Sequence, residues 1–135
     1  MASPFDGRLT SYSASLDALR EAPHRDKKDS FVLSGTSAKF SITFELAWKT
    51  VKDVLTLHYG VTDFVTGSPR ETLRTAFKLD IIRDDRWMDM LDLRKRLAHD
   101  YDLSTIEAAF ETITTEYLGL FDALETKLKD IAADA

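Results

Sequence analysis

The stretch 106-IEAAFETITTEYLGLFDALETKLKDI-131 carries large apolar residues at intervals of three and four positions. They are Ile106, Phe110, Ile113, Tyr117, Phe121, Leu124, Leu128 and Ile131. This period places them on one face of an α-helix, because a strand would need alternation at every second position. At the standard rise the helix would be about 40 Å long. The pattern predicts a long closing helix, and we expect part of it to pack on a second copy of the chain.

Earlier segments repeat this period. Residues 5–22 and about 27–59 each carry a helical seam, and Pro23 with the charged run 24–29 forms the link between them. The second seam comprises Phe40, Phe44, Ala47, Trp48, Val51, Leu55 and His58. Gly60 then supplies the left-handed residue expected where a helix stops. We interpret His58, close to that end, as a cap or core histidine.

The second half of the chain shows two helix-start signals. Ser68, Pro69 and Glu71 form a capping box before a short helix whose buried side is predicted to be Leu73, Ala76 and Phe77. A fourth helix is predicted to begin near Asp84 or Asp85, and a second capping box, Ser104 to Glu107, opens the closing helix. No segment alternates convincingly at period two. The sequence predicts an all-α, up-and-down bundle of four main helices plus one short helix, forming a single domain over residues 1–135 that dimerises.

The amino-acid composition and net charge exclude several classes of function. Cysteine is absent, which excludes disulfides and thiolate chemistry and suits a reducing cytoplasm. No apolar run approaches the length of a membrane span, and no secretion signal is recognisable. The net charge of −5 argues against general nucleic-acid binding. We therefore expect a cytoplasmic protein with no membrane or DNA partner, and any RNA contact would depend on a local basic patch.

An arginine interrupts the apolar face of the fourth helix. With Met90 at 0°, Arg94 falls near +40°, among the positions of Trp87, Leu93 and Leu97. An unpaired buried guanidinium would be very costly. Arg94 must therefore meet a carboxylate, line a cleft, or lie at an interface that water or a ligand reaches. Glu45, at the edge of the second helix's aromatic face, is a possible partner, with a solvated edge carboxylate as the alternative.

His99 and Tyr101 follow Arg94 at spacings of five and seven. An ideal helix separates Arg94 from His99 by about 140°, so the two meet only if the helix ends near Ala98 or if two copies face each other. Taken singly, each residue has an ordinary explanation: a paired structural arginine, a histidine cap, and a tyrosine that packs with its hydroxyl in water.

The chain resembles the HEPN superfamily, and within it the HepT-like toxins once named nucleotidyltransferase substrate-binding proteins. The resemblance covers nearly the whole length. It is carried by FELAWKTVKD (44–53), SPRETLRTAFK (68–78), WMDMLDLRKRLAHDY (87–101) and the closing helix. Its specific element is an arginine, four residues, a histidine, any residue and a tyrosine.

The resemblance implies a homodimer with a cleft between subunits and metal-independent endoribonuclease activity on an RNA substrate. Arg94 and His99 would be the catalytic pair. Tyr101 would accept AMP from a cognate minimal nucleotidyltransferase that acts as antitoxin. A small polar residue commonly follows the arginine in this family, whereas Lys95 stands here; Lys95 and Arg96 are the candidate RNA- or phosphate-binding residues.

Other classes remain open. The acidic charge and Lys95 motivate a non-catalytic subunit that docks a nucleotidyltransferase and presents a substrate to it. The third possibility is an assembly bundle with no ligand. The histidines at 24, 58 and 99 have no metal-ligand spacing, and there is no phosphate-binding glycine loop. We expect neither a metal nor a cofactor.

Overall fold

The computed structural model describes residues 3–64, 67–99 and 102–134. All regular elements in these ranges are helical. They are α1 (Pro4–Leu19), a short 3-10 turn (Ala22–His24), α2 (Ser30–Leu57), α3 (Pro69–Lys78), α4 (Arg86–His99), α5 (Leu103–Thr112), a π-helical segment (Ile113–Tyr117) and α6 (Leu118–Asp134). The predicted fold class is confirmed: four main helices and one short helix, with α5, the π-helical segment and α6 forming the closing one.

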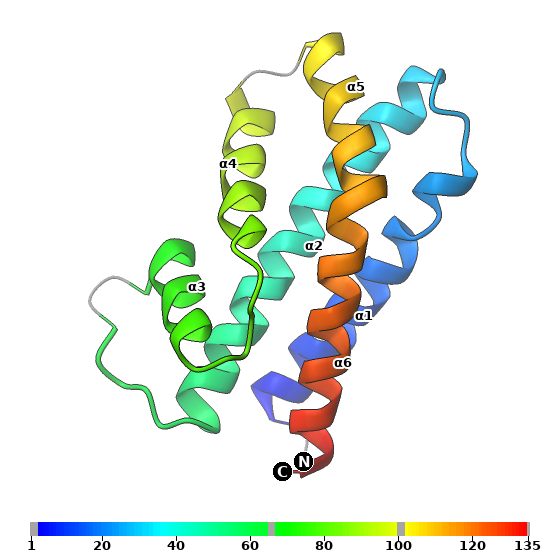
Figure 1. Ribbon diagram of the computed structural model, residues 1–135. Coiled ribbons are helices and arrows are strands. Elements are labelled where there is room, and N and C mark those ends of the chain that lie inside the picture. Colours follow the sequence, from blue (N-terminus) through cyan, green and yellow to red (C-terminus); the bar gives the residue numbers. More distant parts are fainter. Residues whose placement is uncertain (1–2, 65–66, 100–101, 135) are drawn as a thin grey trace.

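The main helices run alternately up and down (Figure 1). α1 and α2 form an antiparallel pair, α4 returns beside α2, and the closing helix descends until both termini lie at the same end of the bundle. The short α3 packs on α2 and α4 and lies at the edge of the bundle. α2 contacts every other main helix and is the central element of the fold.

Side-chain caps fix where the helices begin. Ser3 forms a capping box with Asp6 at α1, and Asp29 accepts a hydrogen bond from the backbone N–H of Phe31 at α2. Ser68 caps α3 as predicted, accepting from the N–H of Glu71. The prediction for the closing helix was wrong by two residues. Its N-cap is Asp102, whose carboxylate accepts from the N–H of Thr105, one of the free backbone donors of the first turn.

The end of α2 is a regular C-terminal stop. His58 is the C-cap, as interpreted from the sequence, and its ring meets Phe5 edge to face. Gly60 follows with φ of 66°, confirming the predicted left-handed residue. The helix itself is shorter at both ends than predicted, Ser30–Leu57 against 27–59, because Asp29 caps its start and His58 its end.

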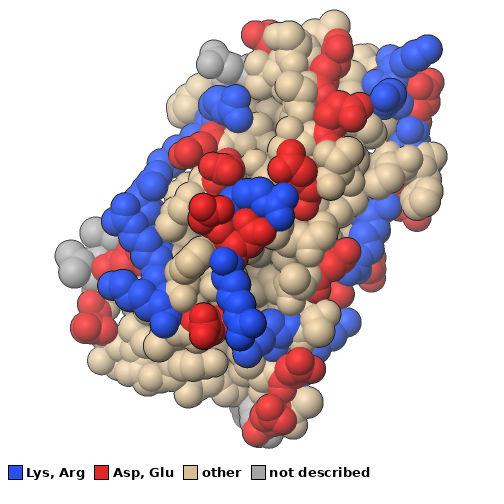
Figure 2. Space-filling model, viewed as in Figure 1, with Lys and Arg blue, Asp and Glu red and all other residues tan. Residues whose placement is uncertain are grey.

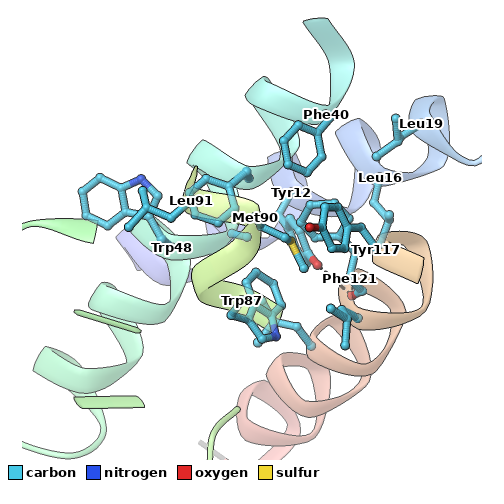
Figure 3. Close-up of a cluster of buried hydrophobic side chains, with 14 of the residues drawn as sticks. Tyr12, Leu16, Leu19, Phe40, Trp48, Trp87, Met90, Leu91, Tyr117 and Phe121 are labelled. Carbon is cyan, nitrogen blue, oxygen red and sulfur yellow. Dashed lines mark hydrogen bonds between the residues drawn. The ribbon is translucent and has the colours of Figure 1, made fainter. Parts of the chain in front are cut away.

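The core is a stack of aromatic rings between α1, α2, α4 and the closing helix (Figure 3). Phe40 stacks on Tyr117 at a centroid distance of 5.8 Å, and Trp87 meets Phe121 edge to face at 5.6 Å. Phe77 was predicted to be buried and is instead 39% exposed. α3 is covered on one side only, by α2 and α4, so the margin of its apolar face stays in contact with water.

The closing helix contains one irregular turn. Residues Ile113–Tyr117 are π-helical, with one residue more per turn than the flanking α-helix. Ile113 and Tyr117 are nevertheless buried, so the predicted seam is continuous across the irregularity.

Tyr12 ties α1 to the closing helix. Its side chain is fully buried, and its hydroxyl donates a hydrogen bond of 2.7 Å to the backbone carbonyl of Phe121. Burial raises the pKa of Tyr12 well above its ordinary value, so the hydroxyl keeps its proton. We expect Tyr12→Phe to lower the free energy of unfolding by about 1 kcal/mol, the net value of one such bond. Urea denaturation should show this loss, and an unchanged midpoint would mean that the bond contributes nothing.

None of the helices in the described ranges is both long enough and apolar enough to span a membrane.

Candidate functional site on helix α4

Arg94 meets a carboxylate of its own chain. Its guanidinium Nη2 lies 2.8 Å from Oε2 of Glu45 on α2. Lys49, one turn further along α2, lies 3.4 Å from the other carboxylate oxygen. Glu45 therefore stands between two cations, and the pair joins α2 to α4. Of the three possibilities derived for this arginine, the structure shows the carboxylate partner.

The ion pair lies at the margin of the core. Arg94 and Glu45 keep 33% and 30% of their side chains exposed, although the Oε2 atom of Glu45 is itself buried. Nearby, Trp48 is 9% exposed and its indole N–H is buried without a hydrogen-bond partner. A third of the Arg94 side chain can thus still be reached by solvent.

His99 leaves α4 in a different direction from Arg94. α4 ends at His99, directly after Ala98, but His99 itself is still helical, so the two side chains leave the helix about 140° apart. His99 is exposed at the last position of the helix. Within one chain α4 does not bring the two residues together, which leaves the alternative of two copies that face each other.

Lys95 and Arg96 are both exposed on α4. Arg96 lines a pocket of about 360 Å³ between α4 and α5, together with the buried Tyr117. Burial, followed by the charges of Asp89 and Glu116, raises the pKa of Tyr117. Tyr101, the predicted AMP acceptor, lies outside the described residues.

Comparison with known proteins places the chain in a family. A family model described as "Nucleotidyltransferase substrate binding protein like" matches residues 7–130. The chain belongs to this family. Curated protein sequences gave no match.

Two solved structures share the fold of this chain. One is a protein from Thermus thermophilus, with a TM-score of 0.76, 22% sequence identity, and coverage of 87% of this chain and 98% of that one. The other is from Haemophilus influenzae, with a TM-score of 0.76, 21% identity, and coverage of 90% and 98%. The latter is described as revealing the fold of a substrate binding domain of a nucleotidyltransferase. At these identities the likeness is one of fold.

Two sets of charged residues in this substrate-binding-like protein were not predicted from the sequence. Arg20, the C-cap of α1, contacts three carboxylates: Asp17, Asp122 and Glu125. The last two are more than 100 positions away, so no local pattern could indicate them. The second group is Arg70, Arg74 and Lys78 on α3, whose spacing of four was visible in the sequence. No group of three or more histidine, aspartate or glutamate side chains suited to a metal occurs in the described part of the chain.

Proposed function

We propose that the chain is the non-catalytic, substrate-binding subunit of a two-component nucleotidyltransferase. It docks a separate nucleotidyltransferase and presents a substrate to that enzyme. The match of residues 7–130 to the substrate-binding family supports this role. The observation that carries it over the catalytic alternative is the 2.8 Å ion pair between Arg94 and Glu45.

The ion pair with Glu45 opposes the positive charge that Arg94 would need as a catalytic residue. An arginine that stabilises a phosphorane needs its positive charge directed at the non-bridging oxygens of the substrate. Here Glu45 already opposes that charge, and it also holds the guanidinium on the α2 side of α4. His99, which would have to exchange protons with the same substrate, projects elsewhere. In the proposed role, the ion pair of Arg94 with Glu45 joins α2 to α4. The other motif residue, His99, is part of the exposed surface of α4.

Co-purification tests this role. A nucleotidyltransferase from the same genome is expressed with the tagged chain, and the retained protein is quantified for wild type and for His99→Ala. We expect equal retention in both and no cleavage of a mixed RNA substrate in the absence of divalent metal. No retention by wild type, or RNA cleavage that His99→Ala abolishes, would refute the proposal.

A HepT-like ribonuclease is the second candidate, and the partial exposure of the motif favours it. A third of Arg94 is accessible, and Lys95, Arg96 and His99 are exposed on the same half of α4. In a homodimer of facing α4 helices, His99 of one subunit would approach Arg94 of the other. One histidine would take the proton of the 2′-hydroxyl as it attacks phosphorus, and the second would protonate the departing 5′-oxygen.

If the chain is a HepT-like ribonuclease, the partner nucleotidyltransferase would inhibit its RNA cleavage by transferring AMP to Tyr101. The tyrosine oxygen attacks the α-phosphorus of ATP, pyrophosphate leaves, and the phenolic proton passes to solvent. The bound AMP would place a bulky anion beside His99 and repel an RNA phosphate. The RNA cleavage measurement described above separates the docking subunit from the ribonuclease. A strictly monomeric mass in solution would count against the ribonuclease.

A further inference from the structure

The outer side of α3 forms a basic groove with the segment that precedes it. Figure 2 shows Lys and Arg side chains gathered along the edge of the molecule over α3 and α4. The groove has a volume of about 590 Å³, within the usual range for small-ligand sites. Its lining includes Val61, Phe64, Arg70, Arg74, Lys78 and Leu79.

Three cations line this groove at intervals of one helical turn. Arg70, Arg74 and Lys78 are four positions apart, so their Cα atoms succeed one another by about 6 Å along α3. Like charges at this spacing repel each other and destabilise a helix. Arg70 has a carboxylate partner, Asp92 of α4, at 3.7 Å. Among the described residues no carboxylate lies within ion-pair distance of Arg74 or Lys78, which leaves two exposed positive charges at one site.

The acidic residues of the groove do not cancel this charge. Glu71 accepts a hydrogen bond of 2.7 Å from the backbone N–H of Gly67, so one of its oxygens is engaged with the start of α3. Asp63 is exposed and is the other carboxylate in the lining. A fourth cation, Lys52 of α2, lies over the ring of Phe64 at 5.8 Å and within 3.3 Å of the carbonyl of Gly67.

The groove also has an apolar side. Val61 and Phe64 are partly exposed, and Leu79 is 39% exposed. A ligand that matches both sides carries two or more negative charges beside a flat, apolar ring. A long nucleic-acid strand fits less well, because affinity for such a strand depends on many cations and the chain as a whole is acidic, with a net charge of −5.

We propose that this groove binds a nucleoside polyphosphate, with Arg74 and Lys78 on the phosphates and Phe64 against the base. The inference rests on the proposed function in one respect: a substrate-binding subunit requires a site for its substrate. Binding itself is a property of this chain alone and is measured without the nucleotidyltransferase.

Calorimetric titration of the purified chain tests the proposal with ATP, AMP, adenosine and inorganic tripolyphosphate as probes. We expect ATP to bind more tightly than AMP, and adenosine not to bind measurably. Arg74→Gln/Lys78→Gln should weaken ATP binding at least tenfold. The matched control is Lys28→Gln/Arg83→Gln, which removes the same two kinds of charge from exposed positions outside the groove and should change ATP binding less than twofold.

Phe64→Leu tests the contact with the base separately from the contacts with the phosphates. It should weaken ATP binding severalfold and leave tripolyphosphate binding unchanged. Equal losses in the groove variant and the charge control would overturn the proposal, as would absence of ATP binding at millimolar concentration. Tighter binding of a single-stranded RNA through Arg74 and Lys78 would overturn it in favour of RNA. Circular dichroism melting of each variant identifies any loss that comes from unfolding.

The result of the ATP titration does not depend on the result of the co-purification experiment. If ATP binds in the groove but the nucleotidyltransferase is not retained, the groove stands and the docking role fails. If the enzyme is retained and ATP does not bind, the docking role stands and the groove proposal fails.

Discussion

Replacing Phe121 with alanine is expected to lower the free energy of unfolding by about 3–5 kcal/mol, the usual cost of removing a buried aromatic ring. Phe121 is fully buried where the closing helix meets three others. Its ring centroid lies 6.3 Å from that of Tyr12, 6.0 Å from Phe40 and 5.6 Å from Trp87. No neighbour can fill the vacated volume without leaving its own partners, so a cavity should persist (Figure 3).

Equilibrium denaturation in urea, followed by far-ultraviolet circular dichroism, measures this effect. Phe31→Ala is the control, because Phe31 is 84% exposed and should change stability by less than about 0.5 kcal/mol. The two substitutions remove the same atoms, and only their burial differs. Similar losses for both would mean that the ring stack does not hold the bundle together.

Arg20→Gln is expected to cost about 1–2 kcal/mol at neutral pH, at the upper end of what a partly exposed ion-pair network contributes. Arg20 lies 2.9 Å from Glu125, whose side chain is 12% exposed, and it also contacts Asp122 on α6 and Asp17 on α1. Removing the cation leaves three carboxylates close together without their shared partner. The value is modest because a third of the Arg20 side chain is exposed and water screens the interaction. Thermal and urea unfolding report the loss, and Arg83→Gln, at a highly exposed arginine, should show none.

The cost of Arg20→Gln should diminish in acid. Burial raises the pKa of Glu125, but the hydrogen bond from Arg20 and the charges of Arg20 and Lys129 outweigh it and hold the pKa below the ordinary 4.5. A carboxyl whose pKa is lowered on folding stabilises the protein above its unfolded pKa and loses that contribution as pH falls through the folded value. The difference between wild type and variant should be full near pH 7 and shrink below about pH 4.5. A constant difference from about pH 7 to about pH 3 would contradict the assignment to Glu125.

The fold was largely predictable because burial imposes a period on the sequence. The seam from Ile106 to Ile131 predicted the closing helix, and Gly60 predicted the end of α2. Phe77 was misjudged because a helical period shows which face is apolar, not how much of that face a neighbour covers. Ser104 was misjudged because two good capping residues, Asp102 and Ser104, lie two positions apart.

The site was less predictable, since its geometry depends on helices far apart in sequence. The sequence indicated that Arg94 needs a partner and offered Glu45 as a possibility. The choice among a carboxylate, a cleft and an interface depends on the position of α2 beside α4, which no local pattern encodes. The basic residues of α3 were visible at their spacing of four, but the groove they line exists only because residues 61–64 fold back beside them.

The π-helical turn at Ile113–Tyr117 affects how the closing helix tolerates a change in length. A π-helical turn holds one residue more than regular α-helix would, so deleting a residue within it would restore α-helix and leave α6 facing the same way. Deleting a residue from the regular helix that follows would instead rotate the rest of α6 by about 100° and turn Leu124 and Leu128, now buried, toward water. The turn is therefore a place where the closing helix can change length by one residue and keep the inward-facing side of its final turns.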